Sequence, residues 1–83
     1  MRVRIISAER SVFDGQATAM VAPAYDGEVG ILPRHAPFMT LLGDGTVTVK
    51  HDGGTEAFHV RGGFLQVVDD IVNIVAEQAD KTQ

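Results

Sequence analysis

The chain contains no cysteine and no tryptophan, and its aromatic residues amount to one tyrosine and four phenylalanines among 83 residues. Without cysteine, a disulfide, thiolate catalysis and a cysteine-ligated zinc site are all excluded. The absence also suits a reducing compartment. So few aromatic residues leave little material for the aromatic platform that a carbohydrate- or peptide-binding sandwich would present.

Basic residues are also scarce, because seven Lys and Arg face eleven Asp and Glu, for a net charge of −4. This balance opposes nucleic-acid binding, which needs a basic face to displace phosphate counterions. It equally opposes a polybasic membrane anchor. The basic start, residues 1–7, has too short an apolar run for a signal peptide, and no stretch is long enough to span a bilayer. We therefore expect a soluble cytoplasmic protein without direct lipid insertion.

The length predicts one domain over residues 1–83, because so short a chain has no room for a second core. Its folded surface should be about 4,800 Å², with roughly 60% of the unfolded surface buried. That is enough for an independent but marginally stable fold. The polar residues 79–83 are expected to be a frayed tail.

Short segments of alternating polarity fill most of the chain. Val47 and Val49 alternate with threonines, and Phe58 and Val60 alternate with polar or small residues. Such alternation predicts half-buried strands, since successive side chains point to opposite faces of a sheet. Turn signals separate the segments: Asp14-Gly15, Asp26-Gly27, Gly43-Asp44-Gly45, Asp52-Gly53-Gly54, Gly62-Gly63 and Asp69-Asp70. The pattern predicts an all-β fold, either a β-sandwich or a flattened barrel.

The segment from Phe64 onward is the one stretch that could be a helix by length. It is rich in β-branched residues, and Asp69-Asp70 divides it into two strand-length pieces. We therefore predict a hairpin here, with Asp69-Asp70 as a solvated turn and not an acid/base pair.

The segment Pro23–Pro37 differs from the rest, with three prolines and two glycines in fifteen residues. We expect a fixed, irregular connection with Tyr25, Glu28, Arg34 and His35 exposed, because proline restricts both itself and the preceding residue. A rigid, charged loop loses little entropy on docking. On composition, a docking surface and a structural crossover between two sheets remain equally supported.

Residues 27–37 of this segment resemble the signature loop of ATP synthase epsilon subunits, called delta in mitochondria. Three further stretches are similar to the family in the same order. The four matching stretches are Gly27-Glu28-Val29-Gly30-Ile31-Leu32-Pro33-Arg34-His35-Ala36-Pro37, Ser7 to Gly15, Gly62 to Val67, and Val72 to Glu77.

The resemblance implies a flattened, ten-stranded β-sandwich acting as a non-catalytic rotor subunit. It would lie in the central stalk of an F-type ATP synthase, coupling ion-driven rotation to ATP synthesis. The implied partners are the gamma subunit and the c-ring, with the catalytic beta subunits as indirect neighbours. The implied location is the cytoplasmic face of the bacterial plasma membrane, as a peripheral protein of the complex.

The resemblance also implies individual contact residues. It places Asp26, Gly27, Glu28, Val29 and Gly30 at the c-ring, and it places Ser7, His35 and Thr40 at gamma. The gamma contact needs an apolar patch, for which outward-facing Ile6, Met20 and Met39 are candidates. The family's C-terminal helical hairpin is missing, either naturally or because the sequence is truncated, so inhibition and ATP binding by that hairpin are not expected.

Other functions find little support in the residues. His35, His51 and His59 show no spacing typical of metal ligands, so we expect no metal and no cofactor. A Gly-x-Ser-x-Gly elbow is absent, which opposes a serine hydrolase. The glycine clusters are interpreted as hairpin turns, since none opens a helix as a phosphate-binding loop does. The alternative to the stalk subunit is a generic small β-sandwich binding module.

Overall fold

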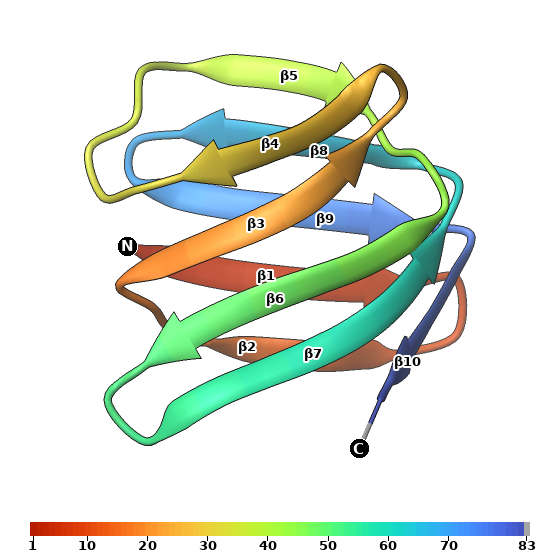
Figure 1. Ribbon diagram of the computed structural model, residues 1–83, viewed down its shortest axis with the longest axis horizontal. Helices are drawn as coiled ribbons and strands as arrows, with labels where there is room; N and C mark the ends of the chain where they lie inside the picture. The colour runs from red at the N-terminus through yellow and green to blue at the C-terminus, as the bar shows by residue number, and fades with distance from the viewer. Residues whose placement is uncertain (83) are drawn as a thin grey trace.

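The computed structural model describes residues 1–82, and within that range the chain forms strands and no helix. Figure 1 shows these strands as two layers. They are β1 (Arg2–Ser7), β2 (Ser11–Gln16), β3 (Ala19–Ala24), β4 (Gly27–Ile31), β5 (Phe38–Leu41), β6 (Gly45–His51), β7 (Gly54–Arg61), β8 (Phe64–Val68), β9 (Ile71–Ala76) and β10 (Gln78–Lys81). The all-β expectation, with ten strands among residues 1–82, is confirmed.

Each layer is a five-stranded sheet. Sheet A has the order β2-β1-β9-β8-β5, and sheet B has the order β10-β7-β6-β3-β4. Neighbouring strands are antiparallel, apart from the central pair β1 and β9, which run parallel. The edge strands β4 and β5 lie along one side of the sandwich, and β2 and β10 lie along the other (Figure 1).

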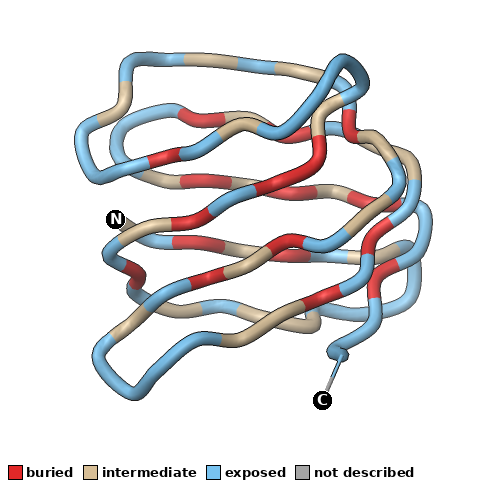
Figure 2. Tube along the Cα trace, viewed as in Figure 1, coloured by how far each residue is buried: buried red, intermediate tan, exposed pale blue. Residues whose placement is uncertain are grey.

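The core lies between the two sheets, where apolar side chains of both layers meet. Along the strands, buried residues alternate with half-buried or exposed ones (Figure 2). Val47, Val49, Phe58 and Val60 from sheet B are fully buried, as the alternation predicted. The accessible surface is 4850 Å², in agreement with the value expected for a chain of this size. The expectation that Met20 faces outward is wrong, because Met20 pairs with Val49 and shares its inward direction.

The hairpin predicted from Phe64 onward is confirmed. β8 and β9 pair from Phe64↔Val75 to Val68↔Ile71, with Asp69 and Asp70 forming the two-residue turn. Their φ angles of 53° and 63° are both positive, as a type I′ turn requires, and aspartate tolerates this region better than most residues do.

The expectation that the whole Pro23–Pro37 segment is irregular is wrong. Gly27–Ile31 forms β4, which pairs with β3 along its length, including Pro23 opposite Glu28. Pro23 is tolerated because its carbonyl points away from β4 and accepts a hydrogen bond from the Gly43 N–H at 2.9 Å. The missing N–H of proline would point in that same direction, so the β3–β4 ladder loses no donor.

The expectation of a frayed tail at residues 79–83 is also wrong for the described residues. Gln78–Lys81 forms β10 against β7, Ala79 is buried, and the Thr82 N–H donates to the Ala57 carbonyl at 2.9 Å. A single buried alanine is a weak local signal, and the pairing that fixes this strand involves residues about twenty positions earlier. Gln83 lies outside the described residues.

Three of the expected turns also differ. Asp14-Gly15 lies inside β2, paired with Arg4 and Val3. Two others are not hairpin turns but crossovers between the sheets: Leu42–Asp44 leads from β5 in sheet A to β6 in sheet B, and Gly62-Gly63 leads from β7 in sheet B to β8 in sheet A. These crossovers were not predicted because local turn chemistry does not record which sheet the next strand joins.

Candidate functional site

The turn between β3 and β4 is held in place by the crossover from β5 to β6. The Tyr25 N–H donates to the Leu41 carbonyl at 3.1 Å, and a β-bridge joins Ala24 to Leu42. The approach is so close that a Cβ atom on Gly43 would lie 2.9 Å from the Ala24 carbonyl oxygen. These backbone contacts fix the turn at Tyr25-Asp26 relative to β5, although the two belong to different sheets.

A shallow groove of about 620 Å³ lies between this turn and β5. Its apolar walls include Tyr25, Met39 and Leu41, whose exposed fractions are 70%, 61% and 63%. Asp26 and Glu28 stand on its rim, so two carboxylates border an apolar floor. Exposed apolar side chains gathered in this way are typical of a surface that a partner covers.

The groove continues into an apolar band across the outer face of sheet A. Leu41 pairs with Phe64, Phe64 pairs with Val75, and Val75 lies beside Ile6 in the parallel pair. Cross-strand partners project from the same face, so the four side chains form one row from β5 to β1. We call this row, Leu41-Phe64-Val75-Ile6, the apolar band.

A charged cluster borders the band at the β1–β2 edge of the same face. The Arg2 guanidinium donates two hydrogen bonds to the Asp14 carboxylate, at 2.8 and 3.1 Å, and Arg4 lies 4.0 Å from it. These hydrogen bonds hold the pKa of Asp14 below its usual value, because they favour the charged carboxylate. The cluster gives the apolar surface a polar rim.

The loop from Leu32 to Pro37 remains irregular but is braced at two points. The His35 N–H donates to the Leu32 carbonyl at 3.2 Å, and the Arg34 N–H donates to the Asp70 carboxylate at 2.8 Å. Arg34 has a φ of 68°, a backbone conformation that is uncommon for a residue other than glycine. Asp70, interpreted from the sequence only as a solvated turn residue, therefore holds this loop against the β8–β9 turn.

The residues assigned to the c-ring lie together. Asp26, Glu28 and Val29 line the groove, and Thr40, assigned to gamma, lines it too. Gly27 and Gly30 belong to the same strand, β4, and are exposed. The geometry thus unites Thr40 with the c-ring set instead of with the other two gamma residues.

Ser7 and His35 lie at opposite ends of sheet A. Ser7 ends β1 next to Ile6, and its hydroxyl accepts hydrogen bonds from the Glu9 and Arg10 N–H groups at 3.3 Å. His35 precedes β5 and is half-buried, so the expectation of an exposed ring is wrong. Its ring packs edge-on against Phe38 at a centroid distance of 5.6 Å.

The sequence reasoning missed Leu41, Phe64 and Val68 as exposed apolar residues. The signal was present, because Phe64 and Val68 occupy the outward phase of a strand whose inward phase, Leu65 and Val67, is apolar as well. Apolar residues on both phases are typical of a strand whose two faces are both covered.

The chain matches a known family over its whole described length. The family model for the β-sandwich domain of the ATP synthase delta/epsilon chain matches residues 1–82. Among curated relatives, the ATP synthase epsilon chain of Acidithiobacillus ferridurans is 44% identical over 79 residues, and epsilon chain 1 of Methylococcus capsulatus is 49% identical over 80 residues. Each match covers 95% of this chain but only 56% and 57% of the relative.

The epsilon chain of Micrococcus luteus is 46% identical, and the match covers 88% of that relative.

Two structures share the fold. A chain of the Euglena gracilis mitochondrial ATP synthase, in a structure titled OSCP/F1/c-ring, has a TM-score of 0.87 at 23% identity, covering 95% of this chain and 51% of its own. A chain of the Tetrahymena thermophila mitochondrial ATP synthase, titled central stalk/c-ring, has a TM-score of 0.78 at 17% identity, covering 95% and 64%.

Through its sequence, its ten paired strands over residues 1–82 and its agreement with these relatives, the chain belongs to the ATP synthase delta/epsilon family, whose β-sandwich domain it carries.

Proposed function

We propose that this chain is a non-catalytic rotor subunit of an F-type ATP synthase, docked in the central stalk between gamma and the c-ring. The observation that carries the proposal is the apolar band continuing into a carboxylate-rimmed groove, on a sandwich of this family. Rotation driven by ion flow would then pass through a stiff body to the catalytic subunits, which contact this chain only indirectly. Its place would be the cytoplasmic face of the bacterial plasma membrane.

The two partners would use different parts of the surface. The β3–β4 turn and β4, residues 26–30, would meet the loops of the c-ring, because Asp26 and Glu28 can pair with polar or basic groups there. Exposed pairs of this kind contribute about 0–1 kcal/mol each, so they set register more than affinity. The apolar band would pack on gamma, whose burial of Leu41 and Phe64 would supply most of the binding free energy.

The positions of Ser7 and His35 require a long contact surface between gamma and sheet A. They lie at opposite ends of sheet A, whose strands of six residues are about 20 Å long. Both residues reach gamma only if gamma covers the whole length of the sheet. Thr40, in the groove, would then lie where gamma and the c-ring meet.

The apolar interior supports the proposal that the chain itself catalyses no reaction. Among the described residues, those classed as buried are apolar. A catalytic acid or base is usually tuned by burial, so such an interior offers no environment for one. Purified protein should release no phosphate from ATP.

The test is co-purification of the tagged chain with gamma and, separately, with the c-ring. Leu41→Glu should abolish gamma binding and spare the c-ring, and Glu28→Lys should weaken c-ring binding and spare gamma. Lys50→Glu, on the outer face of sheet B, is the matched charge-reversal control and should alter neither. If the unaltered chain binds neither partner, the generic binding module becomes the better interpretation.

A further inference from the structure

Strand β10 closes the side of the sandwich opposite the groove. It is the edge strand of sheet B, and it also contacts β1 and β2 of sheet A. An ion pair of 3.6 Å between Arg10 and Asp80 links the two sheets there. β10 therefore joins the layers along this side, whereas the β4–β5 side is hollowed by the groove.

Little apolar surface holds β10 in place. Of its four residues, Ala79 alone is buried. The strand pairs with β7, and hydrogen bonds from the Glu77 and Thr82 N–H groups to carbonyls of Arg61 and Ala57 flank the pairing. Segments with few buried apolar contacts open at lower free energy than the core does, so β10 should be among the weaker parts of the fold.

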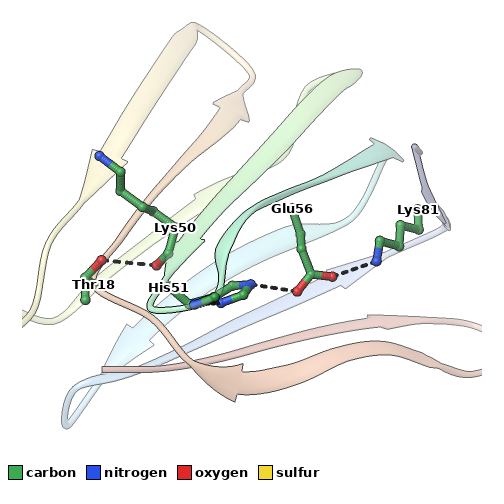
Figure 3. Close-up of polar contacts among 6 residues, drawn as sticks. Thr18, Lys50, His51, Glu56 and Lys81 are labelled. Atoms are coloured by element: carbon green, nitrogen blue, oxygen red, sulfur yellow. Dashed lines mark hydrogen bonds and ion pairs between the residues drawn. The ribbon is translucent and has the colours of Figure 1, made fainter.

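Glu56 holds the end of β10 through its carboxylate (Figure 3). One oxygen, Oε1, lies 2.9 Å from the Lys81 Nζ at the last position of β10, and the other, Oε2, lies 2.8 Å from the His51 Nε2. The Glu56 side chain is 27% exposed, so water and salt screen its ion pair with Lys81 less than they would screen a fully exposed pair. A charge contact of this kind can supply what β10 lacks in apolar burial.

His51 presents Glu56 to the lysine. The Gly53 N–H can only donate, so His51 Nδ1 accepts its hydrogen bond of 3.0 Å. The ring proton is therefore on Nε2, which donates a hydrogen bond to the Glu56 carboxylate. The imidazole stacks on Phe13 of β2 at a centroid distance of 6.4 Å. His51 is thus a positioning residue, and the contacts around Glu56 reach four strands: β2, β6, β7 and β10.

We propose that β10 is a strap that opens and closes separately from the rest of the sandwich, and that Glu56 is the clasp that holds it shut. Opening would free the edge of β7 and expose Ala79, while the core between the other strands stays packed. A freed edge can pair with another extended segment. The clasp lies across the molecule from the groove, so this proposal does not rest on the proposed docking function.

Amide hydrogen exchange, followed by NMR on the 83-residue chain, tests the strap. Glu77 and Thr82 amides should exchange through a local opening, well before the amides of β8 and β9. Glu56→Gln keeps an oxygen for His51 but loses the charge, and Lys81→Met keeps only the stem. Each should lower protection of the strap amides by about two- to fivefold and leave β8 and β9 unchanged.

Two controls separate the clasp from a general charge effect. Lys50→Met removes a neighbouring lysine outside the clasp and should change nothing. Sodium chloride at 1 M, where the Debye length is about 3 Å, should lower strap protection more in the unaltered chain than in Glu56→Gln, in which the exposed Arg10–Asp80 pair remains to be screened.

Equal exchange free energies for the strap and for β9 would overturn the strap, because opening would then require global unfolding. Unchanged strap protection in Lys81→Met would overturn the role of Glu56. Lys81 is exposed, so that variant remains informative even if Glu56→Gln does not fold.

Discussion

Replacing Gly63 with alanine should be among the most damaging single changes to the fold. Gly63 joins β7 of sheet B to β8 of sheet A, with a φ of 101° that residues with a side chain rarely adopt. A Cβ atom there would overlap the Val75 carbonyl and lie 2.8 Å from the Cα of Ala76. These atoms are backbone of β9, so no flexible side chain can move aside.

Two costs add in this substitution. The unfavourable φ costs about 1–3 kcal/mol. Displacing the backbone adds about 1–3 kcal/mol, and it also strains the 3.0 Å hydrogen bond that the Gly63 carbonyl accepts from Leu42. The sum of about 2–6 kcal/mol compares with a total stability of about 4–12 kcal/mol for a chain of this size. Gly63→Ala should therefore lose about half of its free energy of unfolding.

Two other glycines separate the causes. Gly54 has a φ of 129° and open space around its Cα, so Gly54→Ala carries the backbone cost without the overlap. Gly30 has neither problem, and Gly30→Ala should be neutral or slightly stabilising. Urea unfolding followed by circular dichroism measures all three. If Gly63→Ala is no less stable than Gly54→Ala, the overlap with β9 is not as described.

The remaining predictions concern burial, the braced loop and acid. Met20→Ala should cost about 2–5 kcal/mol, and Met39→Ala should cost less than about 0.5 kcal/mol, because one side chain is buried and the other is 61% exposed; similar melting temperatures would contradict this placement. Arg34→Gly should raise the melting temperature by relieving a positive φ. Asp70→Ala should lower the free energy of unfolding by at least about 1 kcal/mol, because it loses the bond to the Arg34 N–H and places alanine at a φ of 63°; opposite signs in calorimetry would refute the brace. Lys81 and then His51 hold the pKa of Glu56 below its usual value of 4.5, so its contribution is complete above that pH and is lost as the pH falls through the lowered pKa; Glu56→Gln should flatten the stability curve in this range, and an unchanged acid limb would contradict the pairing.

Strand positions could be predicted where alternation and turn chemistry agree. Val47 and Val49 mark β6, and the β8–β9 hairpin follows from β-branched residues around Asp69-Asp70, because both signals are local. β4 could not be predicted, since Pro23 of β3, which lies opposite Glu28, indicates a break in the sheet unless its nitrogen is known to face away from β4. That direction depends on Gly43 in a crossover twenty residues later.

Long-range pairing accounts for the other differences. β10 needs the edge of β7, and β1 needs its parallel partner β9 near the other end of the chain. The apolar band could be inferred only in part, because its four residues come from four strands whose order the sequence does not state. Phe64 and Val68, on the outward phase of β8, were the available local sign of a covered face.

The central claim, that the outer face of sheet A docks on gamma, is tested most directly by adding purified gamma subunit to the isotope-labelled chain and following its amide signals. Signals of Ile6, Leu41, Phe64 and Val75 should shift or broaden, while those of Thr46, Thr48 and His59 on the outer face of sheet B should stay unchanged. Perturbation centred on sheet B, or no perturbation at saturating gamma, would contradict the claim.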